Sequence, residues 1–245
     1  MMKQKWEVTS AGLHLIAMAA MLCDHVWRAL ISGNSWMNCV GRIAFPIFAF
    51  LLVEGYFHTH DVKRYAFRLF VCAVLSEVPF DLVMSGQATD WSYQNVLWTL
   101  LIGLGLVYLN DEASKTGNVL EQILVSIATV ILAILVGSIV QADYGSIGLL
   151  MVLLFYFFHG NGLFCKIAQF FGLLVLCILL GSVQQGIRVG HTLLVFPRQI
   201  FAVAALIPIW LYHGRQGYHD KWFQYVCYGF YPVHLLTLGV IAFVM

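Results

Sequence analysis

The sequence predicts an all-α fold, a polytopic bundle of about nine (eight to ten) transmembrane helices. Hydrophobic residues make up 61% of the 245 positions and charged residues only 10%, whereas soluble domains carry about 25% charged residues. Apolar runs of roughly the length that crosses a bilayer follow one another, separated by polar breaks. The lysines and arginines collect in alternate breaks. We therefore expect a single integral-membrane domain over residues 1–245, with the lipid bilayer as a partner.

Each apolar run is expected to form one helix. The first is interpreted as a retained helix rather than a cleaved signal peptide, because it is long and lacks a clear small-residue cleavage site. The fourth and sixth runs are short, which leaves the number of spans open. The expected helices cover about residues 13–32, 39–57, 64–84, 95–109, 119–140, 144–158, 163–183, 192–212 and 222–244.

The basic residues predict the orientation. If there are nine spans, the basic residues of the connecting loops fall on one side of the membrane, and the opposite loops hold little beyond Arg188. This bias places the N-terminus in the cytoplasm and predicts a multi-pass protein of the inner (cytoplasmic) membrane. A net charge of +1 gives no reason to expect a nucleic-acid partner, and the six cysteines lack the paired spacing of a metal site. The residues that set the orientation are Lys3, Lys5, Lys63, Arg64, Lys115, Lys166, Arg215 and Lys221.

Ionisable residues lie inside the expected spans, beginning with Asp24, His25 and Arg28 in the first. A charge at the centre of a membrane helix costs about 2.5–3.5 kcal/mol, so such groups must pair or line a watery cavity. We expect Asp24 to pair with Arg42 or Arg28, and Arg198 to lie near Glu77. The polar residues predicted to converge on the outer half of the membrane are Asp24, His25, Arg28, Arg42, Glu77, Asp81, Gln94, Asn95, Thr99, Asp143, Arg188, His191, Arg198 and His234.

All five prolines also fall within expected spans. A proline removes one helical hydrogen bond and frees the carbonyl about one turn earlier, which membrane proteins tolerate where the helix lines a cavity. Pro46 is expected to free the carbonyl of Arg42, and Pro232 that of Tyr228, close to His234. The others are Pro79, Pro197 and Pro208.

Several strings resemble the TraX family, in the same order and over most of the chain. They are MLCDHVWRAL, GRIAFPIFAFLLVEGYFHT, RLFVCAVLSEVPFDL, QNVLWTLLIGL, ADYGSIGLLMVLLFY and YGFYPVHLLTLGVI. This resemblance implies a transmembrane N-acetyltransferase, since members of the family are F-pilin acetylases and related fimbrial proteins. It also implies acetyl-CoA as the acyl donor, and a pilin N-terminus or another extracytoplasmic amine or hydroxyl as the acceptor.

The resemblance also suggests site residues. His25 is the candidate general base, because its unperturbed pKa is near 6.5. Glu77 or Asp143 from another span could orient its ring, while Arg42 and Asn95 polarise the thioester carbonyl. Asp24 completes the candidate catalytic set. The candidate acceptor-binding residues are Arg28, Glu54, Asp81, Gln94, Asp143, Tyr144, Arg198, Tyr231 and His234.

The basic loop of Lys63, Arg64 and Arg68 is the candidate docking surface for the phosphates of CoA. An ordinary positive-inside anchor would explain these residues equally well. The Asp24 group could instead be a purely structural network, and Glu54 could extend to water. Two other functions stay open for the whole chain: a proton-coupled secondary transporter, and a pilus or secretion assembly subunit without turnover.

Overall fold

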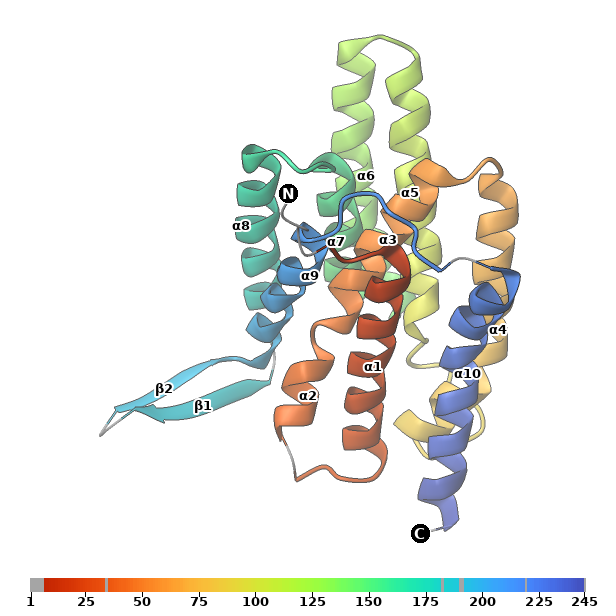
Figure 1. Cartoon of the computed structure of the whole chain (residues 1–245), viewed down its shortest axis with the longest axis vertical. Helices are drawn as coiled ribbons and strands as arrows, with labels where there is room; N and C mark the ends of the chain where they lie inside the picture. Colours follow the sequence, from red (N-terminus) through yellow and green to blue (C-terminus); the bar gives the residue numbers. More distant parts are fainter. Residues whose placement is uncertain (1–6, 34, 182, 190–191, 219, 245) are drawn as a thin grey trace, which may run out of the picture. The chain divides into compact units, whose positions relative to one another are not determined.

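The chain divides into two compact units in the computed structural model, which describes residues 7–33, 35–181, 183–189, 192–218 and 220–244 (Figure 1). Unit 1 holds Met1–Leu51 and Phe158–Phe230, and unit 2 holds Leu52–Phe157 and Tyr231–Met245. Lys3, Lys5 and His191 lie outside the described residues. The chain passes between the units inside two helices, α3 and α10, and after α7.

Unit 1 is built mainly from helices. Thr9 caps its first helix by accepting a hydrogen bond from Gly12 N at 3.1 Å, the usual role of a threonine at a helix N-terminus. α1 packs on α2, α2 on η1, and η1 on α8 and α9. Its elements are α1 (Ser10–Ala29), α2 (Ser35–Gly41), the first part of α3 (Ala44–His58), α8 (Leu163–Leu180), β1 (Gln184–Val189), β2 (Thr192–Pro197), η1 (Arg198–Ala205), α9 (Leu206–Trp210) and the first part of α10 (Lys221–Val244).

The second expected span is interrupted between α2 and α3, at Arg42 and Ile43. Pro46 has no N–H to donate to the carbonyl of Arg42, so the break falls one turn before the proline, where it is expected. Pro79 and Pro232 lie inside helices as predicted. Pro197, in contrast, ends a strand.

The prediction of a helix over residues 192–212 is wrong in its first third. Thr192–Pro197 is a strand that pairs antiparallel with β1, from Gln184 opposite Pro197 to Val189 opposite Thr192. Pro197 is extended, at φ −60° and ψ 129°, and the 3₁₀ helix begins only after it. An apolar run such as TLLVF does not by itself distinguish a strand from a helix, so the all-α prediction misses this hairpin.

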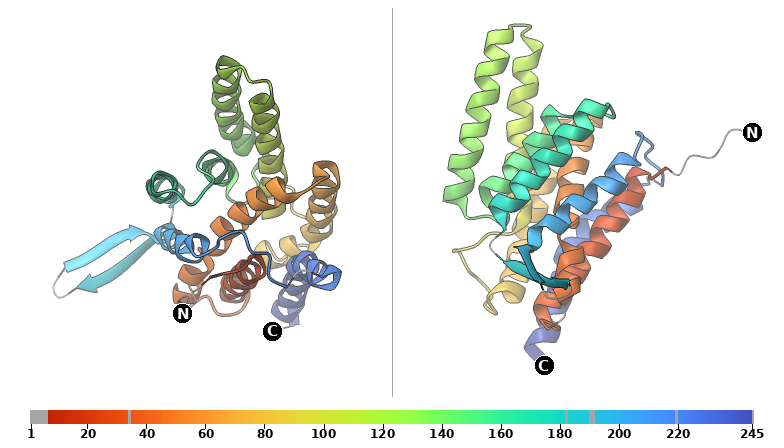
Figure 2. Two further views of the ribbon diagram at one scale, coloured as in Figure 1. Left: turned by 45° about the horizontal axis from the view of Figure 1, so that its top comes forward. Right: turned by 90° about the vertical axis from the view of Figure 1, so that its left-hand side faces the viewer.

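Unit 2 contains α4 (Val62–Met84), α5 (Val96–Lys115), α6 (Val119–Val140), α7 (Gly145–Phe157) and the second parts of α3 and α10. α5, α6 and α7 pack on one another, and α5 and α6 form a long helical hairpin (Figure 2). Their common core consists of Leu106, Ala133, Leu149 and Leu153. Gly137 lets α6 approach α7 closely, since a Cβ there would lie 2.3 Å from the backbone nitrogen of Ser146.

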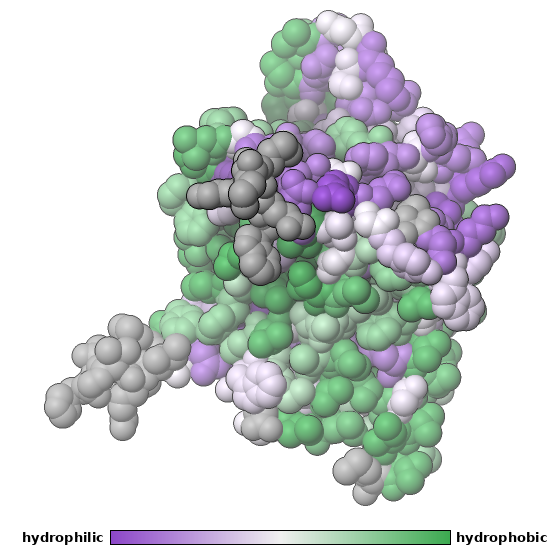
Figure 3. Space-filling view, in the orientation of Figure 1, coloured by the Kyte–Doolittle hydropathy of each residue, from purple (hydrophilic) through white to green (hydrophobic). Residues whose placement is uncertain are grey.

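Six helical segments of the described chain are long and apolar enough to cross a membrane, one of which combines α2 and α3. α4 has 23 residues but carries five charged side chains. Large hydrophobic side chains are exposed along α6 and α8, including Ile139 (78%) and Leu163 (75%). In unit 2, hydrophilic residues gather over the α3–α4 and α5–α6 connections, whereas the helix sides are mainly hydrophobic (Figure 3). These features indicate a membrane-embedded protein; the count of nine spans and the side of the N-terminus stay predictions. The six segments are Ser10–Ala29, Ser35–His58, Val96–Lys115, Val119–Val140, Leu163–Leu180 and Lys221–Val244.

Candidate functional site

Asp24 is the centre of a polar cluster in unit 1. Its Oδ2 accepts a hydrogen bond from Arg42 Nη2 at 2.5 Å, and its Oδ1 accepts one from Asn38 Nδ2 at 2.5 Å. Arg42 Nε also donates to the backbone carbonyl of Asn38 at 3.3 Å. Of the two partners predicted for Asp24, Arg42 is therefore the one in the structure, while Arg28 is exposed and makes no ion pair with it.

Gly41 makes this approach possible. A Cβ at Gly41 would lie 2.4 Å from Asp24 Cβ and 2.7 Å from its Oδ1, distances at which something must shift. The sequence analysis missed Gly41 and Asn38. Asn38 lies one turn before Arg42, so a helical periodicity count around Arg42 would have found it.

A second arginine completes the cluster. Arg198 Nη1 donates to Asn38 Oδ1 at 3.1 Å, and its guanidinium lies 5.7 Å from the centre of the Trp27 ring. Arg198 and Glu77 each have hydrogen-bond partners within their own units, and the expected proximity of Arg198 to Glu77 stays a prediction. Arg198 Nε and Trp27 Nε1 are both buried without a hydrogen-bond partner in the described chain. The cluster thus contains two guanidiniums and one carboxylate, so it carries an excess of positive charge.

His25 follows Asp24 on α1 and is 7% exposed. Adjacent residues on a helix point about 100° apart, so the ring does not share the direction of the Asp24 carboxylate. The role of His25 as a base stays a prediction. The orientation of its ring by Glu77 or Asp143 also stays a prediction.

Glu77 is the centre of a second polar cluster, in unit 2. Its Oε1 accepts hydrogen bonds from Asn95 Nδ2 at 2.6 Å, from Asn95 N at 3.3 Å and from Trp98 Nε1. Asn95 Nδ2 also donates to the carbonyl of Ala73 at 2.9 Å. These bonds use both amide hydrogens of Asn95, so in this structure Asn95 holds Glu77 in place. Oε2 of Glu77 accepts no hydrogen bond from the described residues.

Asp81 lies one turn after Glu77 on α4 and is 5% exposed. Its Oδ2 accepts a hydrogen bond from Asp90 N at 2.8 Å, whereas its buried Oδ1 has no partner among the residues that the structure covers. Neither Glu77 nor Asp81 forms an ion pair with a described lysine, arginine or histidine. This end of α4 therefore holds two carboxyl groups that have no ion-pair partner among the described residues.

Two connecting segments meet beside this cluster. Asp143 N donates to Gln94 O at 2.9 Å, and Tyr93 Oη donates to Asp143 Oδ1 at 2.6 Å. Thr99 Oγ1 donates to the Asp143 carbonyl at 2.5 Å. Tyr144 has a φ of +65°, a left-handed conformation that is strained for a non-glycine residue and that concentrates at functional sites.

Two aromatic residues of α10 belong to the same unit. Tyr231 is 5% exposed and interacts electrostatically with Asp143 and Glu77, and its ring lies 5.8 Å from that of His234. His234 is 7% exposed. Unit 2 therefore brings together six of the candidate residues, namely Glu77, Asn95, Gln94, Asp143, Tyr231 and His234.

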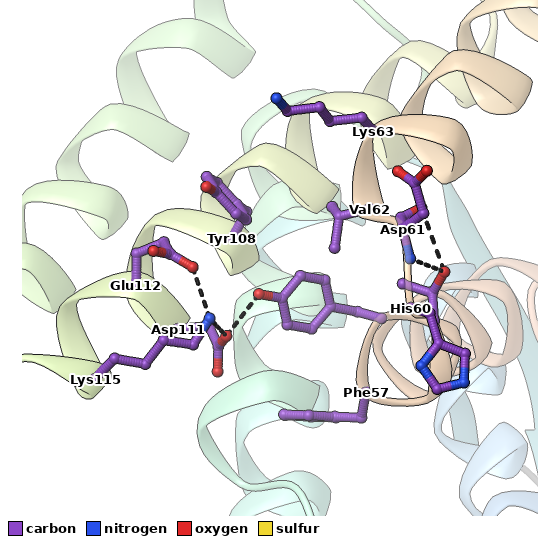
Figure 4. A pocket seen from close by; sticks show the side chains of 11 residues that line it. Phe57, His60, Asp61, Val62, Lys63, Tyr108, Asp111, Glu112 and Lys115 are labelled. Carbon is purple, nitrogen blue, oxygen red and sulfur yellow. Dashed lines mark hydrogen bonds and ion pairs between the residues drawn. The ribbon is translucent and has the colours of Figure 1, made fainter.

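The remaining candidates lie at the other end of α4. Lys63 lines a pocket there (Figure 4). Arg64 pairs with Asp61 at 3.0 Å, and Arg68 lies 5.9 Å from the Tyr65 ring. Glu54 Oε2 lies 3.8 Å from His58 Nδ1. No group of three metal-ligating side chains occurs among the residues that are described.

The sequence also matches known proteins. It is 27% identical over 251 residues to a protein of Dichelobacter nodosus described as probable fimbrial assembly protein FimC, serogroup H1, covering 97% of each chain. No solved structure matches it. The family model described as TraX protein matches residues 10–242, so the chain belongs to the TraX family.

Proposed function

We propose that this protein is a membrane-embedded N-acetyltransferase of the inner membrane, which moves an acetyl group from cytoplasmic acetyl-CoA to an extracytoplasmic amine such as a pilin N-terminus. The observation that carries the proposal is the partly buried, positively charged cluster around Asp24. Acyl transfer needs donors for the oxyanion of its tetrahedral intermediate, and donors in a low-dielectric site stabilise it most.

Arg198 and Trp27 are suited to this role. Arg42 donates hydrogen bonds to Asp24 and to the carbonyl of Asn38. Arg198 Nε and Trp27 Nε1, in contrast, have no hydrogen-bond partner in the described chain. The Asp24 carboxylate holds Arg42, and Asn38 holds Arg198, so the positive charge is fixed before substrate binds. We therefore assign carbonyl polarisation to Arg42 and Arg198, and positioning to Asp24 and Asn38.

The carboxylates of unit 2 are suited to the acceptor. An amine must lose a proton before or during its attack, and a side chain must take it. We propose His25 as the base and Glu77 as the residue that draws the acceptor ammonium in, because Oε2 of Glu77 accepts no hydrogen bond from the described chain. Asn95 and Trp98 fix the orientation of that carboxylate.

The proposed step balances without a metal or a redox partner. The acceptor ammonium first gives one proton to His25, and the free amine then attacks the thioester carbon. The tetrahedral oxyanion collapses, the carbon–sulfur bond breaks, and CoA leaves as a thiolate that takes the second proton lost by the nitrogen. The products are an acetamide and free CoA.

For the donor we propose that Arg64 and Arg68 contact the phosphates of CoA. Arg64 is 85% exposed, and its ion pair with Asp61 is a surface pair that contributes little stability, so the guanidinium can turn to a ligand. Lys63 lines the neighbouring pocket.

The decisive test uses the purified full-length protein in lipid nanodiscs, acetyl-CoA labelled in the acetyl group, and a peptide with a free N-terminus. We expect label in the peptide, and a loss of about 10²-fold or more with His25→Ala, the usual range for removing a general base. Glu121→Gln, an exposed acid on α6, is the matched control and should transfer at the normal rate.

Three results would refute the proposal. His25→Ala could keep full turnover while inserting and melting normally. The wild type could exchange a solute across the bilayer without consuming acetyl-CoA, which indicates a carrier. The wild type could also show neither acetyl transfer nor solute exchange, while deletion of the protein abolishes pili. That result would indicate an assembly subunit, in line with the name of the relative from Dichelobacter nodosus.

A further inference from the structure

Unit 2 contains a pocket of about 470 Å³ where α3 ends, α4 begins and α5 ends (Figure 4). None of its lining residues belongs to the cluster around Asp24 or to the cluster around Glu77. Its wall is mixed in character, with aromatic rings, three carboxylates and two lysines. The lining residues are Tyr56, Phe57, Thr59, His60, Asp61, Val62, Lys63, Tyr108, Asp111, Glu112 and Lys115.

Most of the charges in this wall already have partners. Asp61 caps α4 by accepting from Arg64 N, and it pairs with the Arg64 guanidinium. Lys115 lies 3.0 Å from an oxygen of Asp111 and 2.6 Å from an oxygen of Glu112. One lysine is thus shared by two carboxylates, which leaves one negative charge uncompensated on the α5 wall.

Lys63 supplies the opposite charge. It comes from the first turn of α4, and in the described chain it forms no ion pair. The pocket therefore presents an uncompensated carboxylate on one wall and an uncompensated ammonium on another. A ligand that satisfies both must itself carry one positive and one negative group.

The carboxylate wall is held in place before any ligand binds. Tyr56 is 6% exposed, and its hydroxyl donates to Asp111 Oδ2 at 2.8 Å. Lys115 approaches the same oxygen. Oδ1 of Asp111 and Oε2 of Glu112 accept no hydrogen bond from the described residues and remain available to a donor.

The position of the pocket indicates where such a ligand comes from. α5 has 20 residues and is long and apolar enough to cross a membrane, and the pocket lies at its last turn. A side chain at the end of a span lies at the level of the lipid headgroups. Tyr108, which is 42% exposed, belongs to a residue type enriched at that interface, and Phe57, which is 43% exposed, adds an apolar ring beside the pocket.

We propose that this pocket binds the headgroup of a zwitterionic phospholipid with a primary amine, of the phosphatidylethanolamine class. The lipid ammonium donates to Asp111 and Glu112, and the lipid phosphate pairs with Lys63. A primary ammonium has three N–H donors for these carboxylates, whereas a choline headgroup has none. An anionic lipid or CoA would bring extra negative charge to a wall that already has an excess of it.

The test uses the purified full-length protein, stripped of lipid, and native mass spectrometry with short-chain lipids. We expect phosphatidylethanolamine to bind about tenfold more tightly than phosphatidylcholine or phosphatidylglycerol, the effect of about one charge-assisted hydrogen bond. Glu112→Gln keeps the Tyr56–Asp111 bond and should remove most of this preference. Lys63→Gln should weaken both zwitterionic lipids alike, and Glu121→Gln should change nothing.

Four outcomes would overturn the proposal: equal binding of ethanolamine and choline lipids by the wild type, an unchanged preference in Glu112→Gln, displacement of bound lipid by CoA, or equally tight binding of tail-free glycerophosphoethanolamine. The last would assign the pocket to a soluble molecule instead. None of these measurements depends on acetyl transfer, so the pocket and the proposed function can fail separately.

Discussion

Gly41→Ala tests whether the Asp24 cluster depends on a close approach of α1 and α2. A Cβ at this position would lie 2.4 Å from Asp24 Cβ. Ordinary contacts between such atoms are about 3.5–4.0 Å, so the helices or the Asp24 side chain must separate by about 1 Å. The hydrogen bonds from Arg42 and Asn38, both 2.5 Å now, would then reach about 3.5 Å, which is beyond hydrogen-bond range.

The expected cost is about 1–3 kcal/mol of unfolding free energy, the range for overpacking. The side chains of Arg42 and Asp24 are 21% and 17% exposed, which keeps the expected value below that for breaking a fully buried ion pair. If the acetyltransferase proposal holds, turnover should fall further, by about 10²-fold, because a shift of 1 Å in a positioning group has effects of that size.

The assay is thermal unfolding of the purified protein in one detergent, with Gly105→Ala as the matched control. Gly105 is also helical, and nothing lies within 4 Å of its Cβ position, so alanine there should be neutral or stabilising. An Asp24→Gly background restores the space, and Gly41→Ala should cost little in it. Equal melting of Gly41→Ala and Gly105→Ala, or an unchanged cost in the Asp24→Gly background, would refute the reasoning.

Three further predictions concern stability. Gly137→Ala should destabilise by about 1–3 kcal/mol in the same melting assay, because its Cβ would meet the Ser146 backbone; a neutral result would mean that α6 and α7 can separate freely. Trp98→Phe should lower the free energy of unfolding by about 1.5–3 kcal/mol, because it removes a hydrogen bond to a carboxylate. Trp91→Phe is the control, since Trp91 is 87% exposed and its replacement should leave the unfolding free energy unchanged. The Tyr218 hydroxyl lowers the pKa of Asp220. A lowered folded pKa adds stability that is fully present above the unfolded pKa of about 3.9 and is lost as the pH falls through the folded pKa. Tyr218→Phe should therefore destabilise the protein at pH 6, and its melting curve should converge with that of the wild type at lower pH.

Much of the helical architecture could be predicted from the sequence because a membrane imposes a simple rule on it. A span must be apolar for about 20 residues, and polar residues mark its ends. α6 spans Val119–Val140, the range expected, and α4 begins two residues before the expected start. The β1–β2 hairpin was not predicted because Thr192–Phe196 is as apolar as a membrane helix. Its strand conformation depends on pairing with β1, which the composition of the run does not show.

One ion pair of the candidate site was predicted from the sequence, but its other contacts were not. Ionised groups in apolar helices must pair, which correctly led to Asp24 and Arg42. The same rule could not choose a partner for Arg198, since any acid at a similar depth satisfies it. Its actual neighbours, Asn38 and Trp27, are uncharged and give no such signal.

The break between α2 and α3 explains why a charged cluster can form inside an apolar segment. Asn38 and Arg42 lie one turn apart, so both reach the same carboxylate from one side of α2. Gly41, directly before Arg42, removes the side chain that would keep Asp24 away. Pro46 then prevents the helix from closing over the carbonyl of Arg42, which allows the chain to turn at that residue. Asn38, Gly41 and Pro46 together thus hold the guanidinium of Arg42 against Asp24, and replacing any of the three should displace this ion pair.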